Sequence, residues 1–337
     1  PVISTCPPAL NFEGCTVAVI TGLTYSDVPK PITAIQFQNA GGVATDACGI
    51  TSYSYIDTQS GNCPITVTRV FTLMDACLNS ATCTQIITVS DTQFPVISTC
   101  PPSQTIEGCD LASIPGLPYS SVPVSITVAD FNAAGGVATD ACGIASYSYI
   151  DIQSGNCPIL VTRTYTVTDV CNHSTTCTQV FTINDSQAPW ISTCPPTLNL
   201  TGCDLTAITG LSYSAVPVSI TALQFTNAGG AATDNCGITS YSYVDVQSGN
   251  CPIMVTRTFT LTDACMHSAI CVQTITVNDT QDPVITGCPP SLSLEGCNTT
   301  VIPGLPYSTI PVIITGSDFM MAGGTASDNC GIVTYRY

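Results

Sequence analysis

The chain has 337 residues, of which 21 are cysteines, and carries a formal net charge of −17 with only five lysine and arginine residues. This composition lacks the clustered cations that bind nucleic acid or an anionic membrane surface, so it disfavours both partners. No apolar run approaches the ~20 residues of a membrane-spanning helix. Neither an initiator methionine nor a signal peptide opens the sequence, which is therefore expected to be a mature product or a window on a longer chain.

A repeat of 94 residues organises the sequence. Each copy opens with Pro-x-Ile-(Ser/Thr)-x-Cys-Pro-Pro, at Pro1, Pro95, Pro189 and Pro283. A unit of this length has the size of one small autonomous domain and not of a solenoid repeat. We predict three complete domains and the N-terminal half of a fourth, with the boundaries 1–94, 95–188, 189–282 and 283–337.

The cysteine content indicates the redox compartment. Each complete repeat holds six cysteines and the partial repeat holds three. In so small a unit this density is typical of a disulfide scaffold at an extracellular or cell-surface location, and every cysteine of the complete repeats is expected to be oxidised. A metal site is the weaker alternative, because no Cys-x-x-Cys occurs and the histidines are limited to His173 and His267.

The predicted elements of the first repeat are short and extended. Leu10–Glu13 is expected to form a first strand, and Ile32–Phe37 a second extended run. Ile50–Asp57 alternates tyrosine with serine, as a half-buried strand does. Glycine-rich segments between these runs mark turns.

The clearest strand signal is Ile65–Leu73, in which alternate positions are apolar and the others are mostly threonine. A hairpin turn at Asp75–Cys83 leads into the last predicted strand, Thr84–Val89. No helical period of useful length appears. Short strands bounded by turn signals indicate an all-β chain of antiparallel β-sandwiches, and the linker Asp91–Pro95 is expected to be stiff.

Arg69 falls on the apolar face of its predicted strand, and an arginine recurs there in each complete repeat. An unpaired buried guanidinium is costly, so Asp57, which recurs with Arg69, is its candidate partner. The alternative is that Arg69 lies at a rim of the sheet and extends its head group to water.

Three segments carry a family resemblance: Asp91-x-x-x-Pro95-Val-Ile-x-x-Cys100-Pro101, Thr139-Asp140-x-Cys142-Gly143, and Val161–Asp169 followed by Cys171 and Cys177–Ile183. They resemble the hyalin-repeat (HYR) domain and the related immunoglobulin-like repeats of large bacterial surface proteins. The resemblance implies tandem, disulfide-rich immunoglobulin-like β-sandwich domains in an extracellular stalk or adhesive array. The chain departs from that pattern at Leu78-Asn79 and Asn172-His173, where Gly-Asn is usual, and 16–44 matches nothing in it.

Two disulfide schemes remain open. Cys15 lies nine positions after Cys6, and nine extended residues span about 30 Å, which is too far for a bond between the two. The rival scheme is sequential, with Cys48–Cys63 and Cys77–Cys83. The scheme that suits a sandwich, and that the resemblance favours, is Cys6–Cys83, Cys48–Cys77 and Cys15–Cys63, then Cys100–Cys177, Cys142–Cys171 and Cys109–Cys157, then Cys194–Cys271, Cys236–Cys265 and Cys203–Cys251.

Aspartates recur in the turns and at the repeat ends. Oxygen-rich loops of this kind suit calcium, and domain junctions are a common place for it. The alternative is that each aspartate caps its own turn. The candidate calcium ligands are Asp46, Asp75 and Asp91, with their equivalents Asp140, Asp169, Asp185, Asp234, Asp263 and Asp279. No other cofactor is expected.

Asparagine sequons predict covalent glycans. Asn184 and Asn278 share one register near the junctions and are the favoured acceptors. The remaining sequons are at Asn172, Asn199 and Asn298.

Two functions remain open. The first is a structural repeat protein of an extracellular microbial filament or stalk, whose partners are copies of itself or the continuation of the same chain. The second is an adhesin or carbohydrate-binding array that acts through its loops. No nucleophile, histidine and carboxylate recur together, so no enzyme is expected. The loop candidates are the tyrosines of the recurring Gly-Leu-x-Tyr-Ser loop, Tyr25, Tyr119, Tyr213 and Tyr307.

The partial fourth repeat is expected to need completion. In the favoured scheme Cys288, Cys297 and Cys330 would pair with residues beyond the end of the sequence. The two strongest strands of the repeat are also missing from it. Strands from outside 1–337 are therefore expected to pack against Ile313–Phe319 and Ile332–Tyr337.

Overall fold

The structure is a computed structural model that describes residues 1–337, with 45% of them in strands and 11% in helices. It contains two compact units, Pro1–Asn184 and Asp185–Tyr337, each of which is described by itself. None of its helices combines the length and the apolar character needed to cross a membrane.

The same elements recur at intervals of 94 residues. The first repeat contains β1 Val2–Thr5, β2 Leu10–Glu13, η1 Val17–Val19, β3 Lys30–Ile32, α1 Ala34–Asn39, β4 Val43–Thr45, β5 Ile50–Ser60, β6 Ile65–Asp75 and β7 Ser80–Ser90. The second contains β8 Val96–Thr99, β9 Gln104–Glu107, η2 Leu111–Ser113, β10 Val124–Ile126, α2 Val128–Ala133, β11 Val137–Thr139, β12 Ile144–Ser154, β13 Ile159–Asp169 and β14 Ser174–Asn184.

The second unit continues the series. The third repeat contains β15 Trp190–Thr193, β16 Leu198–Thr201, η3 Leu205–Ala207, β17 Val218–Ile220, α3 Ala222–Asn227, β18 Ala231–Thr233, β19 Ile238–Ser248, β20 Ile253–Asp263 and β21 Ser268–Asn278. The fourth contains β22 Val284–Gly287, η4 Thr299–Val301, β23 Ile313–Ile314, α4 Gly316–Met321, β24 Thr325–Ser327 and β25 Tyr335–Arg336. The domain boundaries given above stay a prediction.

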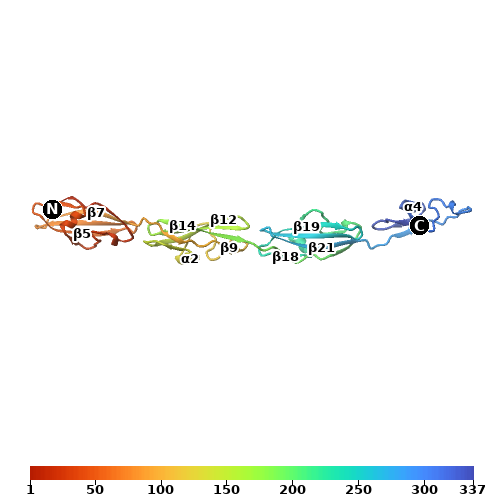
Figure 1. Ribbon diagram of the computed structural model, residues 1–337, viewed down its shortest axis with the longest axis horizontal. Coiled ribbons are helices and arrows are strands. Elements are labelled where there is room, and N and C mark those ends of the chain that lie inside the picture. The colour runs from red at the N-terminus through yellow and green to blue at the C-terminus, as the bar shows by residue number, and fades with distance from the viewer. The chain divides into compact units, whose positions relative to one another are not determined.

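In the first repeat a five-stranded sheet has the order β2-β7-β6-β5-β3. β2 runs parallel to β7, and the other neighbours are antiparallel. A separate two-stranded sheet pairs β1 with β4. The long strands run along the length of the repeat (Figure 1). The second and third repeats have the same two sheets, so the chain is an all-β series of immunoglobulin-like β-sandwich domains, as predicted.

Two apolar clusters fill the inward face of the five-stranded sheet. One joins Phe37 of α1 to Phe71 and Leu73 of β6, and Ile3 and Ala44 of the small sheet pack against it. The other is built around Val67, Ile87 and Val89 and lies under η1 and its flanking loop. The inward face predicted for β6 is confirmed, because its alternate side chains at 67, 69, 71 and 73 are buried.

The predicted partner of Arg69 is also confirmed. Arg69 lies between the two clusters at 1% exposure, which excludes the rim position. Its Nε donates to Oδ1 of Asp57 at 2.7 Å and its Nη2 donates to Oδ2 at 2.8 Å. The guanidinium carbon also lies 4.2 Å from the centre of the Tyr55 ring. The equivalent pairs are Arg163–Asp151 and Arg257–Asp245.

The extended run predicted at Ile32–Phe37 is wrong, because the chain turns into α1 directly after β3. Thr33 caps this helix: its Oγ1 accepts from the Gln36 N–H at 3.1 Å, and the Gln36 side chain accepts from the Thr33 N–H at 2.8 Å. The helix turns Phe37 into the core. A side chain on Gly42 would overlap the Phe37 ring, which explains the glycine there.

The fourth repeat is open. β22 pairs with β24 and β23 pairs with β25, but no five-stranded sheet forms. Apolar side chains such as Leu292 and Val333 are exposed, at 62% and 96%. The strands expected from outside this sequence stay a prediction.

Candidate functional site at the repeat junctions

Disulfide bonds join the first repeat to the second. Cys15 follows β2 and bonds to Cys142 in the turn before β12, with 5.0 Å between the Cα atoms. Cys63 lies in the β5–β6 turn and bonds to Cys171 in the β13–β14 turn, with 5.1 Å between the Cα atoms. Two covalent bridges therefore connect these repeats in addition to the linker.

The second unit has an equivalent bridge between its own repeats. Cys203 of the third repeat bonds to Cys330 of the fourth, with 5.0 Å between the Cα atoms. These positions are 188 residues after Cys15 and Cys142, so the bond repeats the register of the first junction.

The bond predicted between Cys6 and Cys83 is confirmed, and it lies within one repeat. It ties the start of the chain to β7 and closes a loop of 77 residues. In the chain-entropy account a loop of this length stabilises the fold by about 4 kcal/mol. The equivalent bonds are Cys100–Cys177 and Cys194–Cys271.

The structure does not contain the predicted bonds Cys15–Cys63, Cys48–Cys77, Cys142–Cys171 and Cys203–Cys251, nor the sequential rivals. Cys330, which was expected to pair with a residue beyond the end of the sequence, bonds to Cys203 instead. We call the end of a repeat that carries the turns at 46–49 and 76–79 its head, and the end that carries 13–15, 61–64 and 91 its tail. The tail cysteines of the first repeat bond to the head cysteines of the second. Within one repeat, the strands separate the two ends.

The expectation that every cysteine in the complete repeats is oxidised is also wrong. Cys48 and Cys77, at the head of the first repeat, are free and exposed. Cys251, Cys288 and Cys297 are free and exposed in the second unit. The cysteines at the equivalent positions of the middle of the chain, Cys109, Cys157, Cys236 and Cys265, are disulfide-bonded.

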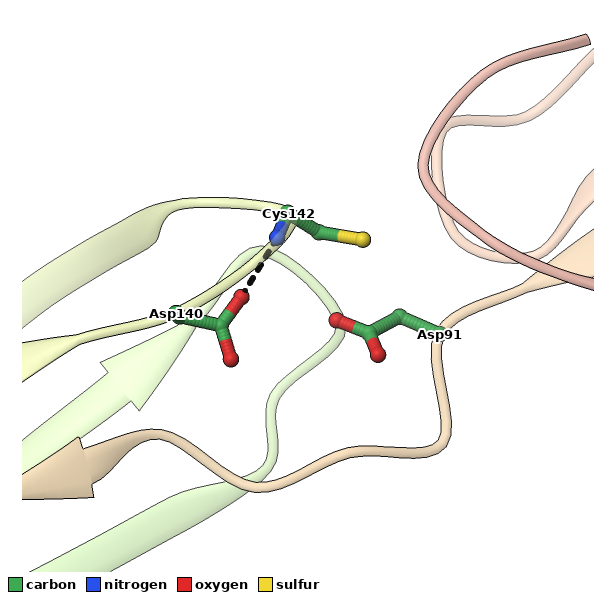
Figure 2. A group of neighbouring side chains, drawn as sticks. All are labelled: Asp91, Asp140 and Cys142. Atoms are coloured by element: carbon green, nitrogen blue, oxygen red, sulfur yellow. Dashed lines mark hydrogen bonds between the residues drawn. The ribbon is translucent and has the colours of Figure 1, made fainter. Parts of the chain in front are cut away.

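An acidic pair lies beside the first bridge. Asp91 lies at the tail of the first repeat, and its side chain points towards Asp140 at the head of the second (Figure 2). A carboxylate oxygen of each lies within 4.8 Å of the other. Asp91 is only 2% exposed; its Oδ1 accepts from the Gln93 N–H at 3.0 Å, whereas its Oδ2 has no hydrogen-bond partner. Oδ1 of Asp140 accepts from the Cys142 N–H at 2.8 Å.

The pair recurs twice in the second unit. Asp185 and Asp234 lie within 4.8 Å together with Asp263, and the Oδ2 atoms of Asp185 and Asp234 are both buried without a hydrogen-bond partner. Asp279 and Asp328 form the next pair, in which Oδ2 of Asp328 is the unpartnered buried atom. Each pair is 49 residues apart in sequence.

The aspartates at the Asp75 position cap their own turns. Asp75 accepts from the Cys77 and Asn79 N–H groups, at 2.8 and 2.9 Å, and from the Asn79 side chain at 2.8 Å. The Asn79 side chain above all, with the two N–H groups, holds the pKa of Asp75 below its ordinary value of 3.8 despite burial. In the later repeats His173 and His267 take the place of Asn79.

The structure groups the candidate calcium ligands differently from the prediction, which took all three from a single repeat. Asp46 and Asp75 lie at the head of the first repeat, and Asp91 lies at its tail. The structure instead brings Asp91 to Asp140 of the following repeat. The sulfur of Cys142 is not available as a ligand, because it is bonded to Cys15. The sequence signal that would have found the pair is a spacing of 49 residues between acidic positions across the linker.

The sequons lie in different surroundings. Asn172 and Asn199 are exposed, the first in a hairpin turn and the second on the edge strand β16. Asn184 and Asn278 end β14 and β21 and are half-buried. The exposed Asn298 accepts from the Thr300 N–H at 3.0 Å and so caps η4. Glycosylation of all five stays a prediction.

A cavity of about 310 Å³ lies between α1 and the sheet in the first repeat, lined by Leu10, Gly22, Gln36, Arg69 and Gln85 among others. The next two repeats have matching cavities of about 370 and 310 Å³. Gln85 recurs at an inward strand position, a signal that the sequence predictions did not include.

The loop tyrosines do not form an exposed binding platform in the complete repeats. Tyr25, Tyr119 and Tyr213 are partly buried and pack against the core cluster near the tail of their repeat. Only in the open fourth repeat is the equivalent residue largely exposed, with Tyr307 at 60%.

Comparison with known proteins adds little beyond this geometry. No family model and no curated protein matches the chain. Among solved structures, it is similar to a protocadherin gammaB7 EC3-6 cis-dimer structure, at 15% identity over 90% of this chain and 81% of that chain, with a TM-score of 0.23.

Two further structures give similar figures. The human desmocollin-1 ectodomain has 11% identity over 86% of this chain and 64% of that chain, with a TM-score of 0.19. The N-terminal Ig1-2 module of the Drosophila receptor protein tyrosine phosphatase DLAR has 9% identity over 55% and 100%, with a TM-score of 0.16. With TM-scores this low, none of these likenesses carries a functional argument.

The fold and the junctions define the class of protein. It is a tandem series of immunoglobulin-like β-sandwich domains held by disulfide bonds within and between repeats. Disulfides of this number persist in an oxidising compartment, so the protein is extracellular or lies at the cell surface.

Proposed function

We propose that the chain is a structural element of an extracellular microbial filament or surface stalk. The observation that carries the proposal is the pair of bridges Cys15–Cys142 and Cys63–Cys171. A flexible string of binding modules needs only its linker, whereas two extra bonds fix the orientation of one domain on the next. The tail of each repeat also carries the cysteines that the next head requires, so the same joint extends to any number of repeats.

The partners in this proposal are further repeats of the same type, from the same chain or from a neighbouring one, and covalent glycans on exposed asparagines. No catalytic role is included, since the buried Arg69–Asp57 pair is committed to the core and no recurring nucleophile lies beside it.

Imaging of native material tests the proposal. We expect electron micrographs to show long fibres of uniform width, with axial periodicity set by the repeat. Treatment with a reductant that leaves the cores folded is expected to make the fibres more flexible. Isolated short rods, or fibres whose flexibility does not change on reduction, would contradict a covalently locked filament.

A second candidate function is a carbohydrate-binding array. It rests on the recurring cavity beside α1, which combines apolar walls with the polar ends of Gln36 and Gln85. Binding of the chain to immobilised glycans, and its loss when Gln85, Gln179 and Gln273 are all changed to leucine, would support this function over the structural one.

A further inference from the structure

We propose that each junction pair of aspartates binds one divalent metal ion of the calcium class; at Asp91–Asp140 and at Asp279–Asp328 the ion would bridge the tail of one repeat to the head of the next. The pairs are Asp91–Asp140, Asp185–Asp234 and Asp279–Asp328. The site is an addition to the structural role proposed above, which rests on the disulfide bridges.

Unpartnered buried oxygens carry the inference. Asp91 and Asp185 are 2% and 1% exposed, and Oδ2 of each is buried without a hydrogen bond. Burying a carboxylate oxygen without a partner is strongly unfavourable, and placing a second carboxylate within 4.8 Å adds repulsion. No lysine or arginine is ion-paired to any of these side chains. Such a site requires a positive charge.

The geometry favours a cation held by oxygen ligands. In the Asp185–Asp234 pair, both Oδ1 atoms accept backbone N–H groups, from Gln187 at 3.1 Å and Cys236 at 2.8 Å. These bonds orient the carboxylates and leave both Oδ2 atoms within the same cluster. Two carboxylates neutralise one divalent ion, and calcium accepts such carboxylates together with carbonyls and waters in flexible geometry.

The other groups around the first pair agree with this assignment. Glu13 lies beside Asp91 and accepts from the Thr92 N–H at 2.9 Å and from the Thr92 hydroxyl at 2.8 Å. It places one more carboxylate near the junction. The Cys142 sulfur is bonded to Cys15, so the ligand set contains only oxygen, which disfavours zinc.

Calcium titration of the oxidised 337-residue chain tests the proposal, after removal of metals with a chelator and at 0.15 M NaCl. Isothermal titration with CaCl₂ is expected to show saturable binding with Kd in the range of about 10⁻⁴ to 10⁻³ M, typical of extracellular modules. Calcium is also expected to raise the unfolding temperature. A chain that neither binds calcium in this range nor shifts its unfolding temperature would overturn the proposal.

Matched variants separate a built site from diffuse charge. Asp185→Asn with Asp234→Asn is expected to remove one bound ion, whereas Asp27→Asn, which removes one exposed carboxylate elsewhere, leaves the stoichiometry unchanged. Equal losses in the two variants would indicate non-specific binding and overturn the site.

A single variant tests the local electrostatics. In Asp185→Asn the new carboxamide can donate to Oδ2 of Asp234, so in chelator this variant is expected to be at least as stable as the parent chain. This variant should also lose the rise in the unfolding temperature of the third repeat that calcium causes. If calcium binding fails while the bridges Cys15–Cys142 and Cys63–Cys171 and the fibres persist, only this proposal falls and the proposed function stands.

Discussion

At the scale of single residues, the buried Arg69–Asp57 pair is the most demanding feature of each repeat. Oδ2 of Asp57 also accepts from the Ser26 N–H at 3.0 Å, and Nη2 of Arg69 donates to the Thr24 carbonyl at 3.3 Å. The pair thereby fixes the loop of 21–29 over the sheet. Its value lies in this geometry, because an ion pair in a core gains little over apolar packing unless its hydrogen bonds are complete.

Removal of the Arg69 guanidinium is expected to lower the stability of the first repeat strongly. Arg69→Met leaves Asp57 charged and buried without a partner, so the free energy of unfolding of the first repeat should fall by about 3–5 kcal/mol. Lys30→Met is the matched control: Lys30 is exposed and donates to the Thr24 hydroxyl, and its loss should change stability by less than about 0.5 kcal/mol. Calorimetry that gives similar losses for the two variants would show that the pair is not needed.

Asp75 is expected to contribute to the loss of folding stability at acid pH. Its pKa in the folded chain lies below the ordinary value of 3.8, chiefly through the Asn79 side chain. A lowered folded pKa contributes stability above that ordinary value, and the contribution is lost as pH falls through the folded pKa. We expect the unfolding temperature of the first repeat to fall below about pH 3.8, and Asp75→Asn to flatten that fall. An unchanged acid limb in the variant would contradict this role.

At the scale of elements, the sequence predicts the long strands well and the covering layer poorly. Ile65–Asp75 alternates apolar and polar side chains strictly enough to define both its conformation and its buried face. α1 has only six residues, too few to show a helical period. Its signal is the Thr33-x-x-Gln36 capping box, which is a local hydrogen-bond pattern and not a hydrophobic one.

The capping box should determine whether α1 holds Phe37 in place. Thr33→Ala removes the acceptor for the Gln36 N–H and is expected to cost about 1 kcal/mol. Hydrogen exchange at the Phe37 amide, which donates to the Thr33 carbonyl at 3.1 Å, should accelerate about fivefold. Ile35→Ala is the control, since Ile35 is 67% exposed on the same helix and should leave this exchange unchanged. Equal acceleration in both variants would contradict the capping role.

At the scale of the whole molecule, the cysteine pairing shows where sequence reasoning stops. Because the repeats are nearly identical, a partner in the same repeat and a partner 94 residues further on have the same sequence surroundings. Cys6–Cys83 was predictable because Cys6 lies at the entrance of the repeat and Cys83 on the last strand of the same repeat. Cys15–Cys142 depends on how one repeat meets the next, and no residue within a single repeat specifies that contact. The acidic pair Asp91–Asp140 was missed for the same reason.

The free thiols at the head of the first repeat allow a direct test of the disulfide joint between repeats. Cys48 and Cys77 occupy the positions at which Cys142 and Cys171 are bonded to a preceding tail. A copy of 189–282 fused directly before Pro1 should supply that tail. With glutathione disulfide as the two-electron acceptor, Cys48 and Cys77 are expected to form bonds to the added copy and to lose reactivity towards alkylating agents.

The control for this fusion is an added copy in which the residues equivalent to Cys203 and Cys251 are changed to serine. Both head thiols should then remain reactive, as judged by mass spectrometry of alkylated peptides. Reactive Cys48 and Cys77 in the unmodified fusion would show that the joint between the first two repeats is not a general property of the repeat.

The bond between Cys6 and Cys83 has a mechanical consequence. It bypasses the 76 residues between Cys6 and Cys83, so the shortest covalent path through that 94-residue repeat contains only 18 residues. At about 3.5 Å per extended residue, this path is roughly 60 Å long even if every hydrogen bond breaks, compared with roughly 330 Å for the open chain. A pulling force along the array is therefore carried by covalent bonds after only a small extension of the chain. The protein should behave under tension as a tether of nearly fixed length and not as a spring that lengthens by unfolding.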